Sequence, residues 1–325
     1  DSLRDEFVTQ RRLLRRSLAA LGRYVIVPGS TIPLGDTATF FPVNPEKEYY
    51  AFIERTWGTK VVTAGMHLNV GLEDNETILR AWRVIRCEAS LYLALSASSP
   101  FFAGSTTGWH STRWHRFPRS PGYTPFFADY ASYRDWLELQ VTSRAIFNHR
   151  NLWLSTRPNG ANTPMSLNRL EIRICDRIGD PDLVIATAAI LRGRVEEILE
   201  DASLDPLSSC SLSPEAIVER IEHNETAVAQ KSLDAEIWDW RSGRSVLVRD
   251  CLDGYIASAG EHVTQLEKVL SRGNDAMQWL TQHEQGRSIQ AILAEQMEKE
   301  AEWDINNQSG KRLPSRMVAS SSKGS

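Results

Sequence analysis

Apolar and polar side chains alternate along residues 167–175, which is the period of a β-strand with one buried face. The aliphatic positions form one face and predict contact with a core: Leu170, Ile172 and Ile174. The opposite face holds a carboxylate between two guanidiniums, followed by a thiol: Arg169, Glu171, Arg173 and Cys175. That combination favours a polar pocket, although a surface ladder of ion pairs would give the same pattern.

The same alternation predicts a second strand over residues 61–71, with His67 and Asn69 on one face and aliphatic residues on the other. Because each strand opposes a polar face to an apolar one, we expect both in one antiparallel sheet. The side chains of His67 and Glu171 should then point into the same concave space.

Apolar residues at three- and four-residue spacing predict helices in much of the remaining chain. The expected helices cover residues 3–21, 77–97, 129–147, 180–201, 213–233, 246–259 and 274–303. Short strands are expected at 24–28 and 151–156, and irregular loops at 29–58 and 98–128. Since strands come mainly before residue 176 and helices after it, the fold class predicted is α+β, with an antiparallel sheet and a helical C-terminal half. Residues 1–305 should form a single domain, followed by a disordered tail at 306–325.

The composition indicates a globular protein and argues against nucleic-acid-binding, membrane and disulfide-rich classes. The chain has 325 residues, of which 42% are hydrophobic and 24% charged, and its net charge of −4 argues against a nucleic-acid partner. No apolar run approaches the roughly 20 residues that span a bilayer, and no signal peptide opens the sequence, which predicts a cytoplasmic protein without a membrane partner. The four cysteines are widely scattered, so reduced thiols are expected rather than disulfides or a cysteine metal site.

The polar faces of the two strands suggest phosphate chemistry. A carboxylate and an imidazole, Glu171 and His67, can hold a divalent cation, and a guanidinium such as that of Arg173 suits phosphate. Mg²⁺ with nearby arginines is what nucleotide-dependent phosphoryl transfer requires. Competing templates are absent from the sequence, which has no GxxxxGK[ST], no GxGxxG after a strand, no HExxH, no CxxC and no GxSxG.

Six blocks of sequence carry a resemblance to a known family. In chain order they are GMHLNVG from Gly65, ALSASSPFFAG from Ala94, STTGWHSTRW from Ser105, LSTRP from Leu154, NRLEIRICD from Asn168 and SLDAEIWDWRSGRSVLVRD from Ser232. On these blocks, which extend over most of the chain except its tail, the sequence resembles the type 2 glutamate–cysteine ligases and their carboxylate–amine ligase relatives. Among them it looks most similar to the cyanobacterial type.

The resemblance implies a glutamine synthetase-like fold, in which an antiparallel sheet forms a funnel, and a ligase of glutathione biosynthesis. ATP would phosphorylate the γ-carboxylate of glutamate, and the amine of cysteine would displace the phosphate to give γ-glutamylcysteine. At matching positions it implies Mg²⁺ ligands at Glu171 and His67, nucleotide contacts at Asn69, Arg173 and Arg249, and catalytic contacts to phosphate or substrate carboxylate at Arg113, Arg157 and Arg173. Glutamine synthetases usually have a second histidine where Asn69 stands, and an amide can still donate to phosphate.

One departure from the family pattern concerns the acidic G-x-E-x-E strand, which is absent from this sequence. The expectation is therefore an amino-terminally truncated catalytic domain without its first strand, whose magnesium cluster lacks carboxylates. Two alternatives stay open: a ligase that joins another carboxylate and amine, or a non-catalytic protein that binds glutamate or nucleotide. A purely structural partner protein would leave the face of Glu171 and Arg173 unexplained.

Overall fold

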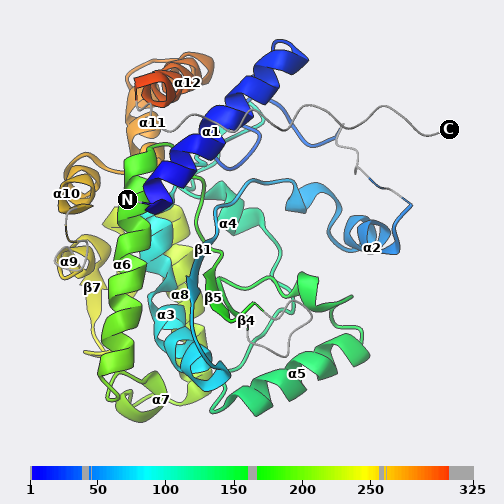
Figure 1. The fold of residues 1–325 in the computed structure, drawn as a ribbon, viewed down its shortest axis with the longest axis vertical. Helices are drawn as coiled ribbons and strands as arrows, with labels where there is room; N and C mark the ends of the chain where they lie inside the picture. The colour runs from blue at the N-terminus through cyan, green and yellow to red at the C-terminus, as the bar shows by residue number, and fades with distance from the viewer. Residues whose placement is uncertain are drawn as a thin grey trace.

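A small antiparallel sheet lies near the centre of the molecule. The computed structural model describes residues 2–38, 44, 46–159, 167–255, 260 and 262–306. The sheet has the order β1 (Leu68–Gly71), β5 (Arg169–Ile172) and β4 (Thr156–Asn159), so that β5 pairs with a neighbour on each side. It lies between a layer of helices and the segments around α2 (Glu48–Trp57) and α5 (Tyr130–Thr142), as Figure 1 shows.

The helical layer is built around α3 (Asn75–Ser96), which contacts β4 and β5 on one side and α6 (Pro181–Glu200) and α8 (Pro214–Lys231) on the others. From Ile78 onward every residue of α3 except Arg80 is buried. The helix is thus enclosed on all sides, its charged residues included, and its apolar residues join those of β5, α6 and α8 in one core cluster. This core supports the apolar face of the sheet.

Helix starts follow the capping chemistry in the sequence. The side chains of Asp180 and Ser213 accept hydrogen bonds from the backbone N–H of Asp182 and Ala216, and proline occupies the first turn of both helices. The predicted helices at 180–201 and 213–233 are therefore confirmed almost to their ends. The predicted α+β class is confirmed as well.

The other elements surround these two layers. Towards the top of Figure 1 lie α1 (Ser2–Leu21), α11 (Asp275–Glu284) and α12 (Ile289–Asn306). The short elements between the main ones are β2 (Phe101–Phe102), β3 (Ser105–Thr106), α4 (Thr112–Arg116) and α7 (Pro206–Ser209). The hairpin of β6 (Glu236–Trp238) and β7 (Ser245–Leu247) precedes α9 (Val248–Asp253) and α10 (Val263–Arg272). The 3₁₀ turns are Gly58–Val61, His149–Asn151 and Ser232–Asp234.

Several predicted elements are wrong. The single helix expected at 274–303 is two helices, α11 and α12, because the chain turns at Gly286, whose φ of 91° is outside the helical region. Residues 24–28 form no strand and leave Tyr24 and Val25 exposed at 64% and 63%. The strand expected at 151–156 begins only at its last residue, after the 3₁₀ turn.

Loops were predicted where the structure has helices. The segment 29–58 contains α2, and the segment 98–128 contains α4 and the β2–β3 hairpin. The expected helix at 246–259 is the shorter α9, and residues 256–259 lie outside the described part of the chain. The tail predicted to be disordered lies outside it as well, except Asn306, which ends α12.

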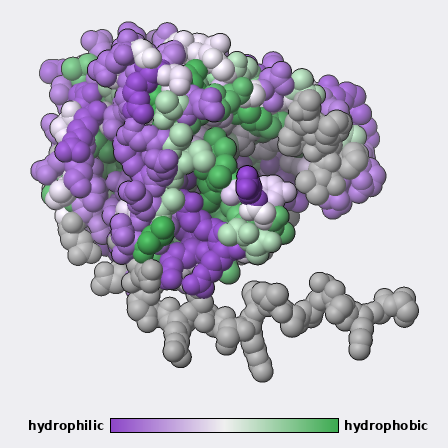
Figure 2. Space-filling view, turned by 90° about the horizontal axis from the view of Figure 1, so that it is seen from above, coloured by the Kyte–Doolittle hydropathy of each residue, from purple (hydrophilic) through white to green (hydrophobic). Residues whose placement is uncertain are grey.

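Hydrophilic and hydrophobic residues are interspersed on the surface. In the view from above, hydrophilic residues cover most of the face and hydrophobic residues lie between them (Figure 2). Some of the exposed apolar side chains belong to α1, among them Leu3 and Leu21. No helix in the described ranges is long and apolar enough to cross a membrane.

A carboxylate in α11 gives a prediction about pH. Asp275 accepts a hydrogen bond from the N–H of Gly179 at 3.3 Å and lies close to Glu300 of α12. Burial, with the charge of Glu300, raises the pKa of Asp275 from 3.8 to about 6 despite that hydrogen bond. Because the folded state holds this proton more tightly than the unfolded state, stability falls as the pH rises through about 4 to 6.

Asp275→Asn should remove this loss. We expect the variant to unfold at a higher urea concentration than the wild type at about pH 8, and at a similar one at about pH 4, where the wild-type carboxyl is protonated. A difference that is the same at both pH values would contradict the assignment to Asp275.

Candidate functional site

The pairing register of the sheet places several of the polar residues predicted from the sequence next to one another. Asn69 of β1 and Arg157 of β4 each lie directly opposite Glu171 of β5. Directly opposed residues in antiparallel strands share a face, so all three point away from the helical layer. Leu170 and Ile172 point the other way and are fully buried in the core. The predicted two-faced sheet is therefore confirmed.

Glu171 is the centre of a dense polar cluster and is only 3% exposed. Its Oε2 accepts from Arg157 Nε at 2.9 Å and from Asn159 Nδ2 at 2.9 Å. Its Oε1 accepts from Arg173 Nη1 at 2.9 Å and lies 3.1 Å from His67 Nδ1. The expectation that His67 and Glu171 meet in one space is confirmed. Asn159 was missed, although its position two residues after Arg157 in the same strand places both on one face.

The charges in this cluster shift two pKa values. Burial alone would raise the pKa of Glu171, but the hydrogen bond from His67 and the charges of Arg157 and Arg173 outweigh it and hold that pKa well below the ordinary range. Burial, then repulsion by Arg157, lowers the pKa of Arg173 to about 10. At neutral pH the carboxylate and the guanidinium are therefore both charged.

Positive charge exceeds negative charge on this face. The carboxylate of Glu171 lies within 3.9 Å of a third guanidinium, that of Arg169, in addition to those of Arg157 and Arg173. The Nε of Arg169 is buried and donates to no acceptor among the described residues. Three guanidiniums around one carboxylate, with a donor left over, could hold an anion such as a phosphate or a second carboxylate.

A divalent cation fits this arrangement less well. Donors already occupy both oxygens of Glu171, and a carboxylate offers about four acceptor positions. The part of the chain that the structure describes contains no group of three or more histidine, cysteine, aspartate or glutamate side chains that could hold a metal. The role of Glu171 and His67 as magnesium ligands stays a prediction, and the geometry itself favours an anion.

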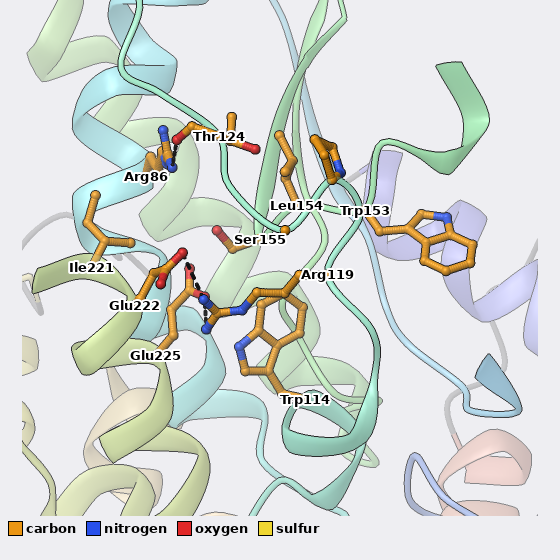
Figure 3. A pocket seen from close by; sticks show the side chains of 12 residues that line it. Arg86, Trp114, Arg119, Thr124, Trp153, Leu154, Ser155, Ile221, Glu222 and Glu225 are labelled. Atoms are coloured by element: carbon orange, nitrogen blue, oxygen red, sulfur yellow. Dashed lines mark hydrogen bonds and ion pairs between the residues drawn. The ribbon is translucent and has the colours of Figure 1, made fainter. Parts of the chain in front are cut away.

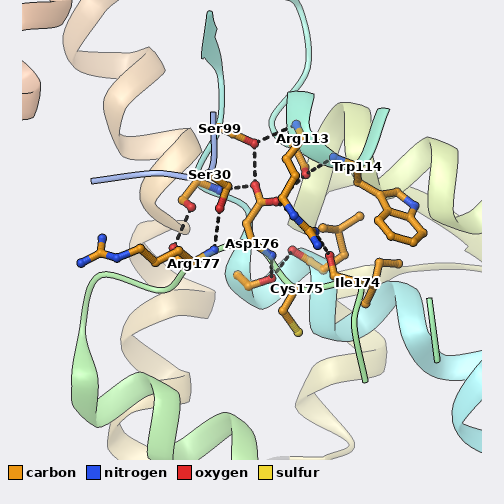
Figure 4. A network of polar contacts seen from close by, with 12 residues as sticks. Ser30, Ser99, Arg113, Trp114, Ile174, Cys175, Asp176 and Arg177 are labelled. Atoms are coloured by element: carbon orange, nitrogen blue, oxygen red, sulfur yellow. Dashed lines mark hydrogen bonds and ion pairs between the residues drawn. The ribbon is translucent and has the colours of Figure 1, made fainter. Parts of the chain in front are cut away.

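Arg113 lies behind β5, in a second network that is shown in Figure 4. The residue is 4% exposed, and its guanidinium donates to the carbonyl oxygens of Ile174 at 2.9 Å and Arg173 at 3.0 Å. Its Nη1 lies 3.7 Å from the carboxylate of Asp176. Arg113 therefore holds the backbone that presents Arg173, and its contacts differ from the direct substrate contact that the resemblance implied.

Asp176, which lies beside the Arg113 guanidinium, also bonds the segments that contain Ser98, Ser99 and Ser111. Its Oδ2 accepts from the N–H of Ser98 at 3.0 Å and the hydroxyl of Ser99 at 2.6 Å, and its Oδ1 accepts from Ser111 at 2.9 Å. Cys175 beside it is fully buried in the core, although strand alternation placed it on the polar face. The prediction for Cys175 is wrong because the regular strand ends at Ile172 and the alternation ends with it.

A glycine next to Arg113 gives a second prediction. A Cβ added at Gly65 would overlap the Arg113 guanidinium, whereas one at Gly71 would have its nearest neighbour, the carbonyl oxygen of Asn168, at 4.0 Å. Gly65→Ala should therefore lower the free energy of unfolding by about 1–3 kcal/mol, and Gly71→Ala should change it much less. Urea unfolding of both variants measures the difference. Equal unfolding midpoints would show that Arg113 is free to move.

Arg249 is separate from the Glu171 cluster. It belongs to α9, across the helical layer from the sheet in Figure 1. Its Nε donates to Asp234 at 2.8 Å and its Nη1 to the carbonyl oxygen of Leu270. These contacts tie α9 to neighbouring segments. The nucleotide contact implied for Arg249 therefore stays a prediction that the geometry does not support.

A small cavity lies beside the start of β4 (Figure 3). Arg119 reaches from its wall towards α8, 2.9 Å from Glu222 and 3.8 Å from Glu225. The cavity volume of about 40 Å³ admits water molecules but not an amino acid. This cavity is therefore too small for a substrate, and the polar cluster around Glu171 remains the candidate site suggested by the sequence.

Comparisons with known proteins show what the chain as a whole is similar to. Two curated relatives, from Herpetosiphon aurantiacus and Leifsonia xyli, bear the name “Putative glutamate--cysteine ligase 2” and are both 26% identical to this chain. The matches cover 77% and 78% of this chain and 66% and 68% of those proteins. The chain therefore spans about two thirds of the length of the curated relatives it matches.

The fold has a counterpart among solved structures. A crystal structure of glutamate–cysteine ligase from Francisella tularensis in complex with AMP superimposes with a TM-score of 0.66, covering 90% of this chain and 74% of that one at 12% identity. This likeness concerns the fold. The family model described as Glutamate-cysteine ligase family 2 matches residues 2–302, which is nearly the whole described chain. The chain belongs to glutamate–cysteine ligase family 2.

Proposed function

We propose that this chain is the catalytic part of an ATP-dependent ligase that joins glutamate to cysteine through a γ-glutamyl phosphate. The observation that carries the proposal is the Glu171 cluster, in which three guanidiniums lie around one carboxylate on the face of the sheet opposite the helical layer. Family membership supplies the reaction class, and the charge of the cluster suits its anionic groups. Residues 1–305 would form one catalytic domain.

The reaction needs several negative charges held together. The γ-carboxylate of glutamate attacks the terminal phosphorus of ATP and ADP leaves, giving γ-glutamyl phosphate. The amine of cysteine then attacks the acyl carbon and phosphate leaves, so that γ-glutamylcysteine and a proton result. In this proposal Arg173 and Arg157 hold the phosphoryl oxygens, because a planar guanidinium donates to two oxygens at once.

The remaining residues of the face would orient these groups. Glu171 holds Arg157 and Arg173 in fixed positions by its hydrogen bonds. Asn69, directly across from Glu171, can donate its amide N–H to phosphate. Mg²⁺ is the expected companion of ATP in such reactions, and we assign it no step here because the donor set around Glu171 favours anions.

A binding protein without catalysis is the second candidate, since an anion site would hold glutamate or nucleotide equally well. The test is an assay of phosphate release by this chain with ATP, Mg²⁺, glutamate and a panel of amino acids. The ligase proposal expects release that requires both glutamate and an amine, with cysteine preferred. Saturable binding of ATP or glutamate without release would support the binding protein instead.

The variant Arg173→Lys tests whether the Glu171 cluster takes part in the reaction. Lysine keeps the charge but loses the planar pair of donors, so phosphate release should fall by at least about tenfold. Arg192→Ala, on the exposed face of α6, is the matched control and should leave the rate unchanged. Equal rates in the two variants would remove Arg173 from the reaction.

A further inference from the structure

A second cavity lies across the helical layer from the sheet. It has a volume of about 400 Å³ and is bounded by α8, the β6–β7 hairpin and residues 209–212. Cavities that hold small ligands usually measure about 300–1,000 Å³. None of the residues that line it belongs to the Glu171 cluster. Any ligand held here would therefore be additional to the substrates of the proposed ligase.

Buried hydrogen bonds fix the aromatic wall of this cavity. Asn224 of α8, only 1% exposed, donates from Nδ2 to the carbonyl oxygen of Trp238 at 2.7 Å and accepts from the N–H of Trp238 at 2.8 Å. Trp240 is 4% exposed and donates from Nε1 to Glu88 of α3 at 3.0 Å. The backbone of Trp238 and the indole of Trp240 are thus held in place before any ligand arrives, which lowers the entropy cost of binding.

Donors without partners stand next to this wall. Arg220 and His223 lie one turn apart on α8, and neither makes a hydrogen bond or ion pair within the described ranges. A second guanidinium, that of Arg241, contacts the hydroxyl of Tyr255 at 3.3 Å and Glu88 at 3.5 Å. Among the described residues that line the cavity, Glu236 is the one acidic side chain. The excess of donors and positive charge favours an anion.

We infer that this cavity binds a small organic anion that carries a planar ring. The anionic group, a phosphate or a carboxylate, contacts Arg220 and His223, and the ring lies against Trp238. Guanidinium and imidazole supply the directed donors, and stacking on an indole contributes about 0.5–1.5 kcal/mol beyond the area it buries. The site does not depend on the ligase proposal, because it shares no residue with the Glu171 cluster.

Calorimetric titration of this chain with phenyl phosphate tests the inference, with benzoate, inorganic phosphate and phenol as comparison ligands. We expect saturable binding of one equivalent of an aromatic anion at this cavity, apart from any anion that the Glu171 cluster takes up. Phenyl phosphate and benzoate distinguish the two anionic groups. Inorganic phosphate and phenol should bind more weakly than either. Arg220→Ala should raise the Kd by about tenfold, equivalent to about 1.4 kcal/mol. It should not alter the melting temperature, because Arg220 has no partner in the described residues.

Two further variants locate the bound ligand. Trp238→Leu should abolish the advantage of phenyl phosphate over inorganic phosphate. Arg173→Lys changes the other anion site and should leave the Kd unchanged. The inference is overturned if the wild type shows no saturable binding, if Arg220→Ala binds as tightly as the wild type, if Trp238→Leu keeps the preference for the ring, or if Arg173→Lys is the variant that loses binding.

Discussion

Replacing Glu171 with glutamine is expected to abolish amide-bond formation and also to lower the free energy of unfolding. The carboxylate is almost fully buried and bonds Arg157 and Arg173. A neutral amide leaves those guanidiniums close together without a counter-charge, which costs about 3–5 kcal/mol for a buried pair. Displaced arginines would no longer hold the phosphoryl group, and the rate should fall by at least about a hundredfold.

Two measurements on the same protein sample separate these effects. Urea unfolding reports the loss of stability, and phosphate release at low temperature reports the rate of the molecules that remain folded. Arg169→Ala is the control on the same face, because its guanidinium lies at 3.9 Å from Glu171 and is 31% exposed, so both effects should be smaller. Near-normal turnover together with a near-normal unfolding midpoint would refute the role given to Glu171.

Glu88→Gln is expected to destabilise the protein by a similar amount. Glu88 of α3 and Arg194 of α6 form a bidentate pair at 2.9 and 2.8 Å, with side chains 4% and 0% exposed. Trp240 also donates to Glu88, so the pair connects two core helices to the β6–β7 hairpin. Removing one charge of such a pair costs about 3–5 kcal/mol.

The matched control for Glu88 lies on the outer surface of α6. Glu196 pairs with Arg192 at 3.5 Å, and both side chains are more than 60% exposed, at 62% and 73%. Glu196→Gln should therefore change stability by no more than about 1 kcal/mol. Urea unfolding compares the two variants. If Glu88→Gln unfolds at the same midpoint as Glu196→Gln, the buried pair contributes no more than an exposed one.

Strand alternation was sufficient to predict which face of β5 carries Glu171, because the opposite face is fully buried. With Leu170 and Ile172 in the core, Glu171 has to point to the other side. The partner in β4 could not be predicted in the same way, since the register that sets Arg157 opposite Glu171 arises from pairing between distant segments. Periodicity along one strand says nothing about its neighbours.

Other parts of the fold were missed for identifiable reasons. The β6–β7 hairpin has a readable signal, a Ser-Gly turn at Ser242 between two short alternating runs, and it was overlooked. Helix α2 follows a segment rich in glycine, proline and threonine, whose composition hid it. The roles of Arg113 and Arg249 could not be predicted from spacing, because a guanidinium that supports a backbone looks the same in sequence as one that contacts a substrate.

The contacts of Asp176 limit how the length of one loop can vary during evolution. Ser99 and Ser111 bind the same carboxylate, so both ends of the segment between them are fixed. Its tip is held as well, by bonds from the N–H of Gly104 and Ala103 to the carbonyl oxygens of Pro33 and Ile32. An insertion or deletion there would break one of these contacts and shift the backbone behind Arg173. Length differences between relatives should therefore be rare in this loop and more frequent in exposed turns such as the one at Gly243, where a Cβ would meet no atom within 4 Å.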